Sequence, residues 1–81
     1  SVEKFKRVAE MGEQSATFWY NYAVFLFNNR DELELNEQAL KAINKAIELK
    51  ERPKYYELKY LLLFVSGNME EAKHLHSYLT D

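Results

Sequence analysis

The stretch from Phe18 to Phe27, FWYNYAVFLF, constrains the fold of this chain more than any other feature. Its ten residues include the only Trp of the sequence and three of its five Phe. A helix that faces water on one side keeps a polar stripe there, and this stretch has almost none. We therefore expect a helix that other elements cover from more than one direction.

Composition restricts the possible partners. The chain has 81 residues and a net charge of -2, so it offers no positive field that would gather nucleic acid. No apolar run approaches the roughly 20 residues of a membrane-spanning helix, so no membrane partner is expected. The absence of Cys excludes disulfides and thiolate chemistry but leaves the compartment open, with the cytoplasm as the default and the bacterial periplasm as the alternative for a segment of a secreted protein.

Apolar residues at helical spacing predict two helices in the first third of the chain. The first covers Ser1–Met11, with Ser1 as its cap and Gly12 in the left-handed conformation that closes it. After a short polar link, the aromatic helix begins at a Ser15 or Thr17 cap and runs to about residue 28.

Three more helices follow. The third begins at Asp31 or at Asn36, with the earlier start favoured, and ends by about Glu51, because the proline that follows cannot continue a helix. The fourth covers Pro53–Val65 and ends at the turn that contains Gly67. The fifth ends with the chain. No stretch has the pattern of a strand, so the sequence predicts an all-α fold whose short links make consecutive helices antiparallel.

The third and fifth helices share one pattern. At a constant offset of 33 residues, Ala39 aligns with Ala72, Ile43 with His76, and Ala46 with Leu79. A helix-turn-helix unit of this length resembles the tetratricopeptide-repeat family, whose period is about 34 residues and whose signature is W-x2-L-G-x2-Y, then A-x3-F, then P. The matched positions are Trp19, Tyr22, Ala23, Leu26, Ala39, Ile43, Ala46 and Pro53 in one unit, and Tyr56, Lys59, Tyr60, Leu63, Gly67, Ala72, His76 and Leu79 in the next.

The resemblance implies one domain, residues 1–81, in which five antiparallel helices form about two and a half units of a right-handed α-solenoid. Residues 1–12 would be the second helix of a truncated unit, residues 16–53 a unit with a long internal link, and residues 54–81 the last unit. Because the family binds peptides or partner helices on the concave face of its first helices, the resemblance implies a non-catalytic protein-interaction module without cofactor or metal. Its groove would contain Thr17, Tyr20, Asn21, Val24, Phe27, Asn28, Lys54, Glu57, Leu58, Leu61 and Phe64, with Val65 beside them.

Four apolar residues of this groove allow different interpretations. Val24, Phe27, Leu61 and Phe64 would form an exposed patch in a lone monomer, and such patches mark interfaces. They are either core residues of a compact five-helix fold or the contact surface for a peptide, a second copy of the chain, or a segment missing from this sequence.

Other functional classes have less support from the residues. His74 and His76 are two positions apart on a helix, so their side chains point about 200° apart and cannot share a metal; we expect His76 packed between units and His74 in water. The main alternative function is an accessory helical segment of a larger bacterial enzyme or thioredoxin-type protein. The start at Ser1, without Met, fits a processed product or a piece of a longer protein.

Overall fold

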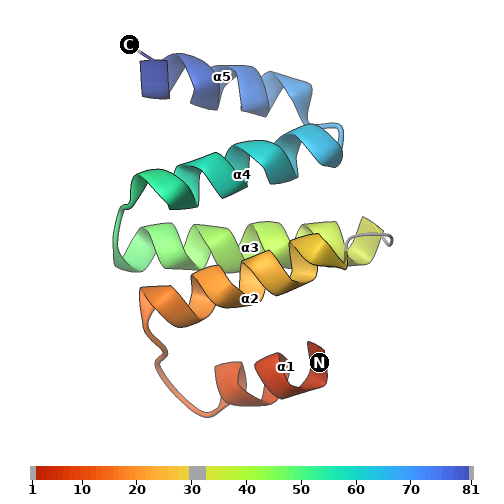
Figure 1. Ribbon diagram of the computed structural model, residues 1–81, viewed down its shortest axis with the longest axis vertical. Helices are drawn as coiled ribbons and strands as arrows, with labels where there is room; N and C mark the ends of the chain where they lie inside the picture. Colours follow the sequence, from red (N-terminus) through yellow and green to blue (C-terminus); the bar gives the residue numbers. More distant parts are fainter. Residues whose placement is uncertain (1, 30–32, 81) are drawn as a thin grey trace.

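The structure is a computed structural model that describes residues 2–29 and 33–80, with Leu33 described by its backbone alone. It contains five helices in these ranges and no strand, which confirms the all-α prediction. The helices are α1 (Val2–Glu10), α2 (Ala16–Asn28), α3 (Leu33–Leu49), α4 (Pro53–Val65) and α5 (Met69–Thr80). Consecutive helices run antiparallel and are stacked in chain order along the longest axis (Figure 1).

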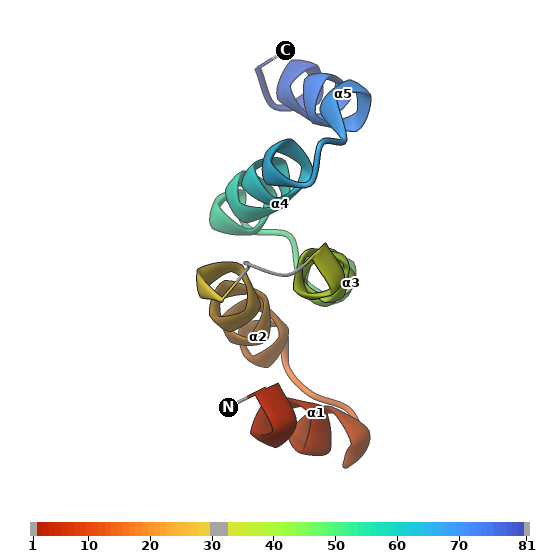
Figure 2. The same cartoon turned by 90° about the vertical axis from the view of Figure 1, so that its right-hand side faces the viewer.

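The helices form two layers. Seen from the side, α2 and α4 lie in one layer and α1, α3 and α5 lie in the other, so the chain zigzags between them (Figure 2). Each helix contacts its neighbours in sequence, α2 also contacts α4, and within the described residues α1 contacts α2 alone. The result is a thin molecule whose Cα extents are 38 × 28 × 14 Å.

Helix α2 is closed at both ends by hydrogen bonds. The Phe18 backbone N–H donates to Ser15 Oγ at 3.2 Å, so Ser15 rather than Thr17 is the cap. At the other end, Asn29 Nδ2 donates to the Phe25 carbonyl at 2.8 Å. The Asn29 backbone N–H also donates to the Leu26 carbonyl, at 3.1 Å. These bonds satisfy carbonyls that the helix leaves without partners at its carboxyl end.

The structure excludes one of the two predicted starts of α3. Asn36 lies inside the helix and is only 5% exposed, so it does not cap the helix. Its Oδ1 atom is buried without a hydrogen-bond partner, and α3 as described runs from Leu33 to Leu49. The other alternative, Asp31, and the predicted cap Ser1 both lie outside the described residues.

The turn between α4 and α5 depends on a glycine. Gly67 has φ = 83°, which side chains other than glycine rarely adopt. This conformation lets the Asn68 backbone N–H donate to the Leu63 carbonyl at 2.8 Å, in the pattern that closes many helices. The predicted limits of α4, Pro53 and Val65, are confirmed.

The core lies where α2, α3 and α4 meet. Its fully buried residues are Ala23, Leu26, Ala39, Ile43, Ala46 and Leu62. The alanines at the matched repeat positions, Ala72 included, are all buried, which allows the helix axes to approach closely. The apolar residues of α2 are therefore covered mainly by α3, with α4 and α1 contacting the remaining sides.

Candidate functional site

The groove residues predicted on α2 differ in exposure. Thr17, Asn21 and Asn28 are exposed, as a surface site requires. Tyr20, Val24 and Phe27 are half-buried and pack against the core. Half of the predicted α2 surface therefore already contributes to the stability of the fold.

On α4, most of the predicted groove residues are exposed. Lys54 and Glu57 are exposed, and Leu61 and Phe64 keep 45% and 51% of their surface in water. Leu58 is an exception, because it is 7% exposed and belongs to the core, so its predicted place in an open groove is wrong. The reason is that α4 packs against α2 and α3 as well as α5, which buries more of its circumference than a single groove-forming face would allow.

One contact does join the two predicted halves of the groove. The rings of Tyr20 on α2 and Tyr55 on α4 stack with centroids 5.0 Å apart. Lys54 Nζ lies 4.9 Å from the centroid of the Tyr20 ring, within the range of a cation–π contact. The structure thus brings Tyr20 and Lys54 together, next to Tyr55, which was not among the predicted groove residues.

The exposed apolar surface continues from α4 onto α5. A hollow of about 320 Å³ lies between these helices and is lined by Glu57, Tyr60, Leu61, His76, Leu79 and Thr80. Leu79 and Tyr78 are 45% and 69% exposed. Sequence analysis missed these α5 residues as surface candidates, because the repeat alignment places Leu79 opposite the fully buried Ala46.

The two histidines of α5 are both exposed. This confirms the expectation for His74 but not for His76, whose ring centroid is 5.9 Å from that of Tyr60. Its repeat equivalent, Ile43, is fully buried because α4 packs on α3, whereas within the described residues only α4 contacts α5. His76 therefore borders the α4–α5 hollow and is not packed between units.

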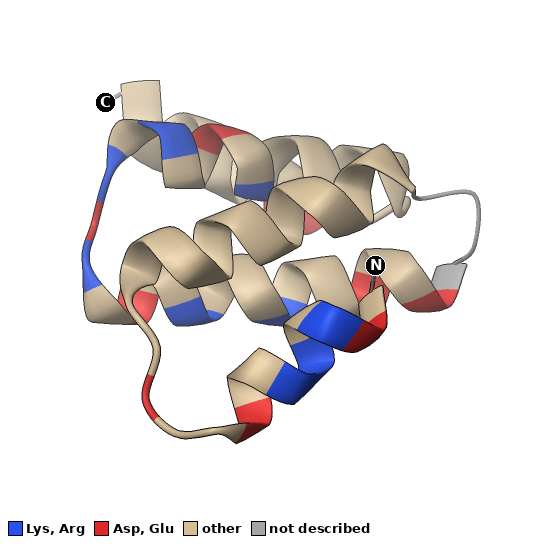
Figure 3. Cartoon of the chain, turned by 60° about the horizontal axis from the view of Figure 1, so that its bottom comes forward, with Lys and Arg blue, Asp and Glu red and all other residues tan. Residues whose placement is uncertain are grey.

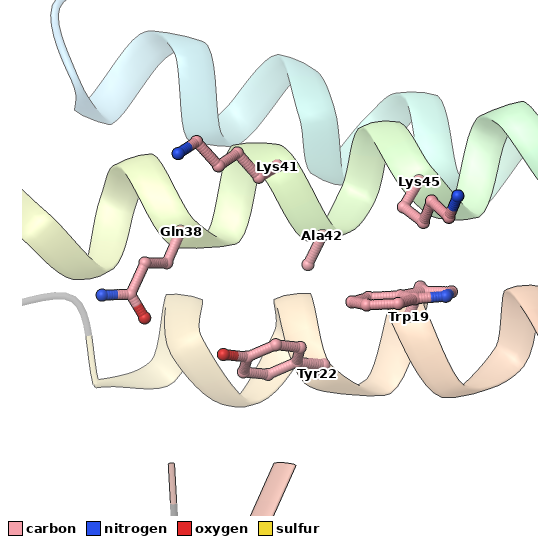
Figure 4. Close-up of a pocket in the computed structure, with 6 residues that line it drawn as sticks. All are labelled: Trp19, Tyr22, Gln38, Lys41, Ala42 and Lys45. Carbon is pink, nitrogen blue, oxygen red and sulfur yellow. The ribbon is translucent and has the colours of Figure 1, made fainter. Parts of the chain in front are cut away.

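A second hollow lies between α2 and α3. It measures about 310 Å³ and is lined by Trp19, Tyr22, Gln38, Lys41, Ala42 and Lys45 (Figure 4). Trp19 Nε1 and Gln38 Oε1 are buried and have no hydrogen-bond partner. The sequence carried one signal of this site, the lysines at positions 41 and 45, but lysines at this spacing are equally typical of a helix face in water.

Two phenols have shifted acidities. A hydrogen bond that the Tyr56 hydroxyl donates to Glu51 raises the pKa of Tyr56 to about 12. Burial, with a smaller effect of the negative charge of Glu3, raises the pKa of Tyr22 above its ordinary value. Both hydroxyls therefore stay protonated at neutral pH and act only as hydrogen-bonding groups there.

In residues 2–29 and 33–80, no three His, Asp or Glu side chains are grouped to hold a metal ion. None of the described helices is long and apolar enough to cross a membrane. Comparison of the chain with protein-family models, with curated proteins and with solved structures found no match. A functional interpretation must therefore rest on the surfaces described above.

Proposed function

We propose that this chain is a tetratricopeptide-like protein-interaction module that binds an amphipathic helix or peptide on the exposed apolar surface of α4. The observation that carries the proposal is the exposure of Leu61 and Phe64, at 45% and 51%, next to the buried Leu62 and Leu63. Exposed apolar residues that are grouped, rather than scattered, mark contact surfaces. Such a module requires no catalytic group, cofactor or metal.

The layered arrangement supports the repeat part of the proposal. The 33-residue offset aligns α3 with α5, and both helices lie in the same layer, opposite α2 and α4 (Figure 2). In a right-handed α-solenoid of two and a half units, α2 and α4 would be the first helices of successive units and α1 the second helix of an incomplete one. The contact between α2 and α4 agrees with this assignment.

The size of the patch predicts a weak, reversible complex. Complete burial of a Leu or Phe side chain is worth about 1.5–3 kcal/mol, so covering the exposed halves of two side chains contributes about 1.5–3 kcal/mol in total. A micromolar complex needs about 8 kcal/mol. The partner must therefore also cover neighbouring residues such as Tyr60 and Leu79, which border the α4–α5 hollow.

A selection experiment tests this function. A displayed library of amphipathic peptides is selected on the wild-type chain, and the enriched peptides are then titrated against Phe64→Asp and against Asn44→Asp, an equally charged change at an exposed position on α3. We expect Phe64→Asp to keep its circular dichroism spectrum and to lose binding, while Asn44→Asp keeps both. The proposal fails if no enriched peptide depends on Phe64.

A further inference from the structure

A second candidate surface lies between α2 and α3, outside the proposed α4 site. The hollow above Trp19 and Tyr22 adjoins another of about 400 Å³, which extends toward the turn after α1 and reaches Leu49 of α3. Trp19 and Lys45 line both hollows, so together they form one elongated depression, which we call the Trp19 trough. Its lining residues on α3 run from Gln38 to Leu49, about three helix turns, an extent that suits an extended chain.

The wall formed by α1 is loosely attached. No residue of α1 is buried, and α1 contacts α2 but not α3. In the side view, α1 and α3 stand apart in one layer, and α2 lies in the other layer at a height between them (Figure 2). A ligand that entered this space would gain contacts with α1 and α3 without displacing any packed interface between them.

Two polar atoms of the trough lack partners. Trp19 Nε1 is a donor and Gln38 Oε1 is an acceptor, and both are buried without a hydrogen bond. In Figure 4 the indole lies between α2 and α3, with Lys45 next to it and Gln38 toward the other end of the site. Buried polar groups without partners are costly, and an extended peptide offers backbone carbonyls and N–H groups at intervals that can satisfy one donor and one acceptor.

The α3 wall of the trough is cationic. Lys41 and Lys45 are exposed, and within the described residues Lys41 makes no ion pair, while Lys45 makes only a long one, 3.9 Å, to Glu48. Glu13 is the one acidic residue among those that line the two hollows. Along α1, basic residues lie between acidic ones (Figure 3). The charge of the α3 wall thus selects for a negatively charged occupant.

We propose that the Trp19 trough binds an acidic peptide segment of a partner protein. Carboxylates of the segment pair with Lys41 and Lys45, and an aromatic or aliphatic side chain packs on Trp19 and Ala42. One peptide carbonyl of the segment accepts a hydrogen bond from Trp19 Nε1, and a peptide N–H farther along the segment donates one to Gln38 Oε1. The Lys45 side chain, 46% exposed, moves aside to uncover the indole N–H.

Trp19 supplies a site-specific readout, since it is the only Trp in the chain. The uniformly labelled protein gives a single indole N–H cross-peak by NMR. The probe is the peptide acetyl-Glu-Asp-Phe-Glu-Glu-Leu-amide, and the control probe has Lys in place of each acidic residue. We expect the acidic peptide to shift the indole cross-peak downfield in a saturable way, with an affinity that falls as salt rises, and the basic peptide to leave it in place.

Matched variants separate this surface from its alternatives. The double change Lys41→Glu/Lys45→Glu should weaken binding by about tenfold or more, because two attractions become repulsions. Lys73→Glu on α5 and Phe64→Asp on α4 should leave it unchanged. If the reversed pair perturbs folding, Lys41→Gln/Lys45→Gln gives a milder loss in the same direction.

The proposal is overturned by an indole cross-peak that does not move at millimolar acidic peptide, by an equal shift with the basic peptide, or by unchanged affinity in the double lysine variant. A shift produced as well by inorganic phosphate alone would also overturn it, because the trough would then bind small anions rather than a peptide. Loss of binding in Phe64→Asp would assign the peptide to the α4 surface instead.

Discussion

Truncation of Ile43 to alanine tests whether the contact among α2, α3 and α4 is the core of this chain. The Ile43 side chain is fully buried, and its repeat equivalent His76 is exposed. The two positions are related by the 33-residue offset, but Ile43 is in the core and His76 is in water. The same truncation should therefore have very different effects at the two sites.

The magnitude follows from the burial of Ile43. Loss of three carbon atoms from the core costs about 2.4 kcal/mol at about 0.8 kcal/mol per methylene. A residual cavity of about 50 Å³ adds about 1.2 kcal/mol at about 24 cal/mol per Å³. The sum, about 3.6 kcal/mol, is a large share of the roughly 4–12 kcal/mol expected for a chain of 81 residues.

Urea denaturation followed by far-ultraviolet circular dichroism measures both variants. We expect Ile43→Ala to lower the free energy of unfolding by about 3.6 kcal/mol and His76→Ala to change it by less than about 0.5 kcal/mol. The assignment of the core is refuted if Ile43→Ala costs less than about 1 kcal/mol, or if His76→Ala costs as much as Ile43→Ala.

Three further predictions concern single groups. Because its hydrogen bond to Glu51 raises the pKa of Tyr56 from 10.0 to about 12, the folded chain holds this proton more tightly than the unfolded chain. The stability that this hydrogen bond adds is complete below the unfolded pKa and is lost as the pH rises through about 12. Tyr56→Phe should remove this part of the pH dependence, which alkaline denaturation curves followed with phenolate absorbance measure. Ser15→Ala removes the cap of α2 and should lower stability by about 1 kcal/mol, measured by urea denaturation, while Ser15→Asp should retain it. Gly67→Ala should lower stability by about 1–2 kcal/mol in the same assay. The whole cost comes from the positive φ, because a Cβ at this position meets no atom within 4 Å, and an unchanged midpoint would contradict this.

Capping and helix-breaking residues in the sequence were sufficient to place most helix ends. Ser15, Pro53 and Gly67 each act through a local backbone property, namely a side-chain acceptor, a fixed φ and a permitted positive φ. Such properties do not depend on the rest of the fold. Asn36, the less favoured of the two predicted starts of α3, is not a cap, because a residue that is typical of a cap can also be buried inside a helix that begins earlier.

The surfaces were harder to predict than the helices. α4 is apolar around most of its circumference, so periodicity alone could not show that Leu58 is buried and Leu61 exposed. That difference depends on which helices pack on α4. The Trp19 trough was missed for a similar reason, since its shape depends on where α1 and its turn lie relative to α3, and no local signal in the sequence records that placement.

The neighbour-to-neighbour packing also has a kinetic consequence. Almost all helix contacts join elements adjacent in sequence, and chains with such local contacts form their native pairings quickly. The same arrangement divides the molecule into parts of unequal cooperativity, because α1, with no buried residue and a single partner, can open while α2, α3 and α4 stay folded. Such opening of α1 would widen the end of the Trp19 trough that Ala9 lines, at temperatures below the melting of the core.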